Sequence, residues 1–139
     1  MRKLIVASFA ALMIAIGGLG VAIADDADDI KATITAQLEA FKAGDAEGAY
    51  SHAAPGIRTL FPDAERFMAM VQGGYGPVYA SSTATFGPMT AVGELFQQEV
   101  YLSDPQGRNW VARYILQRQP DGSMKIAAVQ MRRGDDIAT

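Results

Sequence analysis

The chain has 139 residues, with 12 Lys and Arg, 15 Asp and Glu, one His and no Cys, and its formal net charge is −3. This length fits one domain, and 50% apolar with 19% charged residues is typical of a globular protein. The lack of Cys excludes disulfides, thiolate nucleophiles and a lipidated N-terminal Cys. One His excludes a multi-histidine metal site, and the acidic balance argues against nucleic-acid binding. We therefore predict a protein without a metal, a cofactor or a nucleic-acid partner.

Residues 1–24 are predicted to be a secretory signal peptide. Arg2 and Lys3 precede an uncharged apolar run over residues 4–16, and Ala22-Ile23-Ala24 is a small-x-small cleavage signature. The alternative is an uncleaved membrane anchor, because residues 4–24 are just long enough to span a bilayer. Three glycines near the end of this segment favour cleavage.

Cleavage after Ala24 leaves a single predicted domain over residues 25–139. It removes two basic residues, so 10 basic and 15 acidic residues remain and the net charge becomes −5. We expect a periplasmic or secreted protein that has no membrane attachment once the signal peptide is gone.

The first half of this domain is predicted to be helical, in three pieces. An acidic start and an apolar stripe at spacings of four, four and three predict a first helix that Gly44 ends. Asp45 is placed to cap a short helix that runs to about His52 and stops at Pro55-Gly56, and Asp63 is placed to cap a third helix that ends at Gly73-Gly74. The apolar stripe of the first helix is Ile30, Ile34, Leu38 and Phe41.

The second half has the period of β-strands. Residues 78–79 and 83–86 are predicted as short extended pieces, and residues 95–102, 109–119 and 124–131 as stronger strands. Asp104-Pro105-Gln106-Gly107 and Pro120-Asp121-Gly122 are turn sequences, so the strands should be sequential and antiparallel. Helices followed by an antiparallel sheet define an α+β architecture.

A pairing of Ser103 with Arg108 and of Gln119 with Ser123 would sort the strand residues onto two faces. Gln98 and Arg113 would lie opposite each other on one face, within an apolar patch. Glu99 would lie on the other face, with the aromatic residues Tyr101, Trp110 and Tyr114. Both faces would be substantially apolar, so one would meet the helices and the other would be available for a homodimer through the sheet.

Each face suggests one kind of chemistry. If the first face is inward, Arg113 with Gln98 would bind an anion such as a carboxylate, and the alternative is an arginine paired with a carboxylate of the chain itself. If the second face is inward, burial would raise the pKa of Glu99, and Tyr101 or Tyr114 would donate a hydrogen bond. The alternative is an exposed Glu99 with the aromatic rings as packing. A register error of one residue would exchange the two faces.

Five segments of the chain carry a family resemblance: ITAQLEAFKAGDAEGAY, AAPGIRTLF, RFMAMVQGGYGPVY, QQEVYLSDPQGRNW and RYILQRQPDGSMKIAAVQM. In this order they resemble an exported bacterial family, the domain of unknown function family 4864. The resemblance covers about residues 30–131, with Met124 standing where the pattern has a tryptophan. It implies a layout similar to the nuclear-transport-factor-like, or cystatin-like, fold: helices on a curved antiparallel sheet, shaped like a cone. No catalytic residue is established for the family, so none is carried over.

We therefore expect an exported binding or interaction module without catalytic activity, because no nucleophile, metal or cofactor motif is recognisable. Its partner would be a second copy, a small hydrophobic molecule or an anion. The alternative is a cofactor-free pocket enzyme that performs acid/base chemistry on a small hydrophobic molecule, with Glu99 as the proton carrier. The candidate ligand-binding residues are Gln98, Glu99, Arg113 and Tyr114, and no residue is predicted to be catalytic.

Overall fold

A computed structural model describes residues 23–134 of the chain. The predicted signal peptide falls almost wholly within residues 1–22, outside the described residues, so its prediction stays untested. Among the helices of the described residues, none has the length and apolar character needed to cross a membrane.

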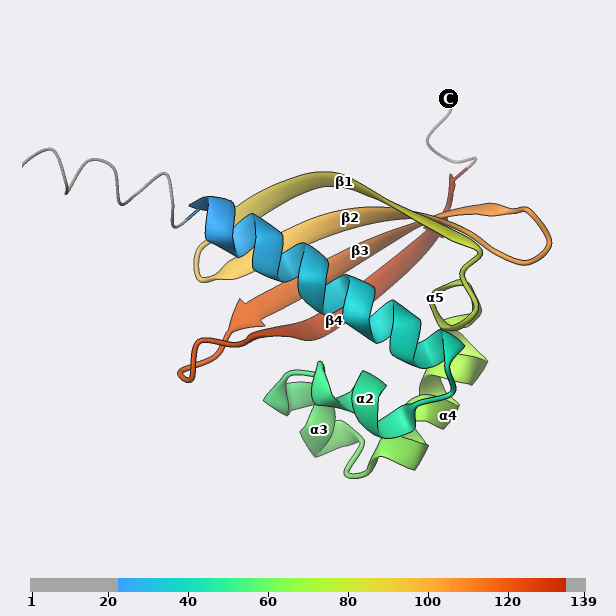
Figure 1. The fold of residues 1–139 in the computed structure, drawn as a ribbon, viewed down its shortest axis with the longest axis horizontal. Coiled ribbons are helices and arrows are strands. Elements are labelled where there is room, and N and C mark those ends of the chain that lie inside the picture. The colour runs from blue at the N-terminus through green and yellow to red at the C-terminus, as the bar shows by residue number, and fades with distance from the viewer. Residues whose placement is uncertain (1–22, 135–139) are drawn as a thin grey trace, which may run out of the picture.

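The structure is α+β, as predicted: helices pack against one four-stranded antiparallel sheet. A long helix over residues 23–42 lies across one face of the sheet, and α2 to α4 gather beyond β4 (Figure 1). The strands follow in the order β1-β2-β3-β4, so each pairs with its neighbour in sequence. The remaining elements are α2 (Ala46–Ser51), α3 (Pro55–Leu60), α4 (Ala64–Gly74), α5 (Gly76–Tyr79), β1 (Thr83–Val92), β2 (Leu95–Ser103), β3 (Asn109–Arg118) and β4 (Met124–Arg133).

The predicted helical signals are confirmed. The stripe from Ile30 to Phe41 is buried, with at most 5% of any of its four residues exposed. The Asp45 carboxylate accepts the Gly48 N–H at 2.9 Å and caps α2, and the Asp63 carboxylate accepts the Arg66 N–H at 2.8 Å and caps α4. Local sequence therefore determines where these helices begin.

The second helix ends near His52, as predicted, but Pro55 then opens a further helix, α3, that was not predicted from the sequence. The prediction that residues 78–79 are extended is wrong, because they belong to α5, which has Pro77 in its first turn. Proline suits the first turn of a helix, where its missing N–H would have no partner in any case.

β1 is also longer than predicted, because it continues to Val92 past an irregularity between Phe86 and Met89.

The predicted register of the first hairpin is wrong by one residue. Ser103 pairs with Asn109 rather than Arg108, and the Asp104 N–H donates to the Arg108 carbonyl at 3.0 Å. The loop therefore has three residues and ends on Gly107, whose φ of +79° favours glycine. The second hairpin is as predicted, since the Gln119 N–H donates to the Ser123 carbonyl at 2.8 Å.

Asp104 fixes the register of the first hairpin. Its carboxylate accepts hydrogen bonds from the Arg108 N–H at 2.9 Å, the Arg108 Nε at 2.7 Å and the Trp110 Nε1 at 3.0 Å. Burial opposes ionisation of this carboxyl group, but the hydrogen bonds from Trp110 and Arg108 and the Arg108 charge outweigh it and lower its pKa to about 2.

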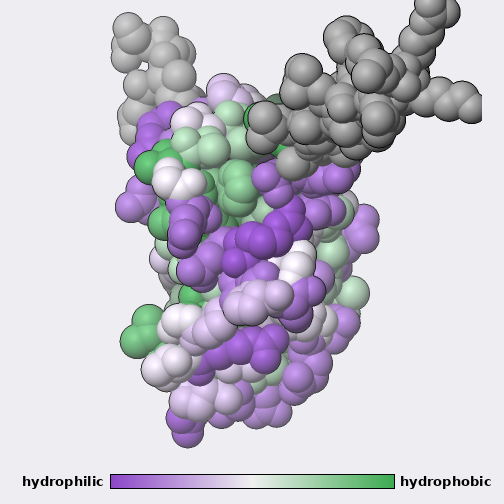
Figure 2. Space-filling model, turned by 90° about the vertical axis from the view of Figure 1, so that its left-hand side faces the viewer, coloured by the Kyte–Doolittle hydropathy of each residue, from purple (hydrophilic) through white to green (hydrophobic). Residues whose placement is uncertain are grey.

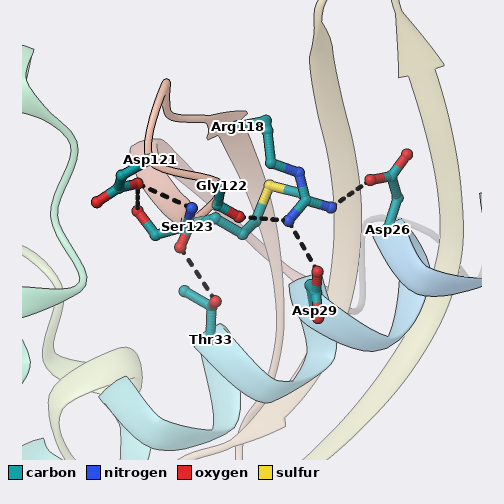
Figure 3. Close-up of polar contacts among 8 residues, drawn as sticks. Asp26, Asp29, Thr33, Arg118, Asp121, Gly122 and Ser123 are labelled. Atoms are coloured by element: carbon teal, nitrogen blue, oxygen red, sulfur yellow. Dashed lines mark hydrogen bonds and ion pairs between the residues drawn. The ribbon is translucent and has the colours of Figure 1, made fainter. Parts of the chain in front are cut away.

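A cluster around Arg118 joins the start of the long helix to the β3–β4 turn (Figure 3). The Arg118 guanidinium binds the carboxylates of Asp26 and Asp29, the latter at 2.8 Å, and donates to the Gly122 carbonyl at 2.8 Å. One turn further along the helix, the Thr33 hydroxyl donates to the Met124 carbonyl at 3.1 Å. The end of the molecule that holds this cluster is mainly hydrophilic (Figure 2).

Candidate functional site

An apolar pocket of about 360 Å³ lies between the helices and β4. The long helix, α3, α4, α5 and the middle of β4 all contribute to its wall. This volume is at the lower end of the range of small-molecule sites, which begins at roughly 300 Å³. The lining residues are Gln37, Phe41, Ile57, Leu60, Phe61, Phe67, Met70, Val71, Tyr75, Val78 and residues 126–129.

Aromatic packing fixes the inner wall of the pocket. Phe67 of α4 stacks on Phe41 of the long helix with ring centroids 6.2 Å apart, and it tilts against Tyr50 at 5.5 Å. The Tyr50 hydroxyl donates to the Phe61 carbonyl at 2.6 Å, which ties the end of α3 to α2. The wall is therefore built from side chains held by their own packing.

The edge strand β4 forms the opposite wall and is pinned beside the helices. The Ile126 N–H donates to the His52 carbonyl and the Ala54 N–H donates to the Ile126 carbonyl, both at 2.8 Å. These two bonds continue the sheet by one bridge into the segment between α2 and α3. They fix the position of β4 relative to the segment that leads into α3.

Few polar groups reach the pocket. Gln37 is buried, and its Nε2 donates to the Ala49 carbonyl at 3.1 Å. Tyr75 brings a phenol, and no charged side chain is among the lining residues. Leu60 lies at the pocket with 75% of its surface exposed. The chemistry of this lining suits an apolar ligand that meets one or two hydrogen-bonding groups.

The predicted site residues do not line this pocket, and the register separates them. Gln98 pairs with Tyr114 and Glu99 pairs with Arg113, so Gln98 lies on the helix-covered face and Arg113 on the open face. The predicted juxtaposition of Gln98 with Arg113, and that of Glu99 with Tyr114, are therefore both wrong. Glu99 does share a face with Tyr101, as predicted.

Gln98 and Tyr114 are buried in the core. The Gln98 Nε2 donates to the carbonyls of Gly87 at 2.9 Å and Glu99 at 2.8 Å, which supports the irregular stretch of β1. The Gln98 Oε1 and the Tyr114 hydroxyl have no hydrogen-bond partner among the described residues. Burial raises the pKa of Tyr114 well above its usual range, so this phenol stays protonated.

Glu99 and Arg113 lie on the open face, the side of the sheet away from the long helix. The Glu99 carboxylate accepts from the Tyr101 hydroxyl at 3.3 Å and from Arg132 at 3.5 Å. This face mixes charged with apolar residues, so the prediction of two substantially apolar faces is wrong. The homodimer through the sheet stays a prediction.

The pocket residues were not identified from the sequence because helix α3 was not predicted. Ile57, Leu60 and Phe61 form a short apolar group between Pro55 and Pro62. Pro55 at the first position of a helix was the signal that would have predicted α3, whose Ile57 and Leu60 line the pocket together with Phe61 at its C-terminal end.

The only histidine, His52, ends α2. Burial and the nearby Lys125 charge lower its pKa, so it is neutral near pH 7. Within residues 23–134, no three or more acidic or histidine side chains come together in a way that could hold a metal ion.

The fold and pocket together define a small α+β domain with an apolar cavity between its helices and the edge of its sheet. The sequence profile of a domain of unknown function, DUF4864, matches residues 23–139, and the chain belongs to this family. No curated protein matches the chain in sequence.

Proposed function

We propose that this protein is an exported, non-catalytic module that binds a small hydrophobic molecule in the pocket between its helices and β4. The observation that carries the proposal is the pocket itself, about 360 Å³ in volume and lined by apolar side chains apart from Gln37 and Tyr75. Its size and lining are those of a site that recognises a ligand by shape and burial of apolar surface.

The position of the acid/base candidates supports binding over the alternative of a pocket enzyme. A general acid or base has to lie within hydrogen-bonding reach of the proton that it moves. Glu99 and Tyr101 lie on the open face of the sheet, whereas the pocket lies on the helix side. Tyr114 lies in the core and does not line the pocket.

Export and the cystatin-like likeness belong to the same proposal. The basic start, apolar run and Ala-x-Ala sequence support a cleaved signal peptide. The long helix lying across a twisted antiparallel sheet supports a relationship to the nuclear-transport-factor-like layout (Figure 1). Mass spectrometry of the protein recovered from the periplasm of a bacterial host tests export, because cleavage after Ala24 leaves Asp25 as the first residue.

Ligand binding is tested with N-phenyl-1-naphthylamine, a neutral dye whose fluorescence rises in apolar surroundings. Leu60→Asp places a charge at the pocket on a side chain that is 75% exposed, so the fold should not change. We expect this variant to weaken dye binding by about tenfold, because the dye would meet a charge that apolar surface cannot solvate.

The matched control is Val92→Asp, a change of the same kind at a residue that is 59% exposed and lies at the end of β1, away from the pocket. This control should bind the dye as the wild-type protein does. Equal weakening by both substitutions, or no dye binding by the wild-type protein, would overturn the proposal.

A further inference from the structure

A second candidate site lies on the open face of the sheet, centred on Arg113. The register places Arg113 of β3 between Glu99 of β2 and Gln130 of β4. The next row of the same face holds Tyr101, Val111 and Arg132. Two guanidinium groups and one amide therefore occupy adjacent positions on β3 and the edge strand β4.

Arg113 has a donor that the described chain leaves unused. Its Nε is buried and has no hydrogen-bond partner among the described residues. Glu99, directly across from it, makes its contacts instead with the Tyr101 hydroxyl at 3.3 Å and with Arg132 at 3.5 Å. A buried donor without an acceptor costs free energy, and proteins normally supply an acceptor for it.

A small cavity of about 130 Å³ lies beside the Arg113 side chain. Val111, Arg113, Gln130, Met131 and Arg132 line it. Val111 is only 3% exposed and gives it an apolar floor. The cavity has room for a small acceptor group, since a water molecule takes about 30 Å³ of liquid volume.

We propose that this cavity binds the carboxylate of a small monocarboxylic acid between Arg113 and Arg132. Guanidinium groups match the planar carboxylate with paired hydrogen bonds, and the Gln130 amide lies next to them. Two guanidinium charges and the Glu99 carboxylate leave a local charge of about +1, which suits a monoanion better than phosphate.

The body of such an acid would lie along the open face towards Tyr101. A neighbouring hollow of about 460 Å³ shares Val111 with the cavity and is also lined by Tyr101. Tyr101 is 40% exposed and packs over Gly87, where a Cβ atom would meet its ring at 2.7 Å. The ring and Val111 offer apolar contact to an aromatic or short aliphatic body.

Titration of the purified protein with phenylacetate, followed by ¹⁵N–¹H NMR, tests this site. We expect saturable shifts of amides in β3 and β4, and about tenfold weaker binding in Arg113→Gln and in Arg132→Gln, since each removes one charged partner. Phenylacetamide has the same shape without the charge and should not bind.

Two variants act as controls. Arg66→Gln removes an arginine from α4 whose side chain is 71% exposed, and it should bind phenylacetate as the wild type does. Leu60→Asp should also leave this binding unchanged, which separates the site from the apolar pocket on the other side of the sheet. The proposal is overturned if the wild-type protein does not bind phenylacetate, if phenylacetamide binds equally well, if phosphate binds more tightly, or if Arg66→Gln weakens binding as Arg113→Gln does.

Discussion

The two faces of the sheet differ in the burial and charge of their polar groups. On the helix-covered face, Gln98 and Tyr114 are buried among apolar side chains, and the phenol stays neutral. On the open face, Glu99, Arg113 and Arg132 carry charges beside apolar residues. Neighbouring residues along one strand therefore have different roles: alternate side chains build the core, and the side chains between them form a charged surface.

The largest expected effect separates two adjacent residues of β3. Leu116 faces the helices and is fully buried, whereas Ile115 faces the open side and is partly exposed. We expect Leu116→Ala to lower the free energy of unfolding by about 3 kcal/mol. Ile115→Ala should cost about 1 kcal/mol, because less apolar surface is lost. Urea unfolding of both variants measures the difference, and equal losses would contradict the assignment of the faces.

The next effect concerns Asp104, which fixes the register of the first hairpin and therefore which side chains of β2 and β3 face the helices. The pKa of Asp104 is about 2 in the folded protein and close to 3.8 when the carboxyl group is free, so the unfolded state binds more protons between these values. The stability that Asp104 gives is therefore present above pH 4 and is lost as the pH falls towards 2. Asp104→Asn should lower the urea midpoint at pH 7 and flatten its fall between pH 4 and pH 2. If the urea midpoint of Asp104→Asn fell between pH 4 and pH 2 as steeply as that of the wild type, Asp104 would not be the group that causes the loss of stability in acid.

The smallest expected effect on stability concerns Tyr114, whose hydroxyl is buried on the helix-covered face. The Tyr114 hydroxyl is buried without a partner among the described residues, so Tyr114→Phe should leave stability unchanged or raise it by about 1 kcal/mol. The raised pKa of Tyr114 also means that the unfolded state loses its phenolic proton first, so the wild type should lose stability as the pH rises above about 10.

Tyr114→Phe should weaken that alkaline loss. Thermal unfolding at pH 7 and pH 11 compares the two proteins, and a strongly destabilised variant would reveal a hydrogen bond to the hydroxyl.

Local signals in the sequence predict most of the fold. The Asp45 and Asp63 caps and the stripe from Ile30 to Phe41 need only neighbouring residues, and each is where the sequence places it. The first hairpin could also have been predicted, because Asp104-Pro-Gln-Gly-Arg108 and Gln119-Pro-Asp-Gly-Ser123 share one pattern and close in the same way. Treating both turns alike gives the correct register.

The candidate site was less predictable, because it depends on contacts between distant elements. The β3–β4 irregularity between Ile115 and Leu116 changes the pairing beyond it and moves Val129 and Met131 to the face of Tyr114. A bulge leaves little trace in a single sequence. The pocket depends on how α3, α4 and β4 meet. Arg113 was a candidate from the sequence, but its true neighbours, Glu99 and Gln130 in place of Gln98, depend on the strand register.

If the chain is exported as we propose, the Arg118 cluster affects the order of two events, cleavage of the signal peptide and folding of the start of the long helix. Asp26 would be the second residue of the mature protein, yet its partner Arg118 follows 92 residues later. In a chain that crosses the membrane unfolded, Arg118 would emerge long after Asp26, so the cluster would form only once most of the domain has crossed. The bond between Ala24 and Asp25 would then be accessible to the peptidase before the first turn of the long helix is held against the β3–β4 turn.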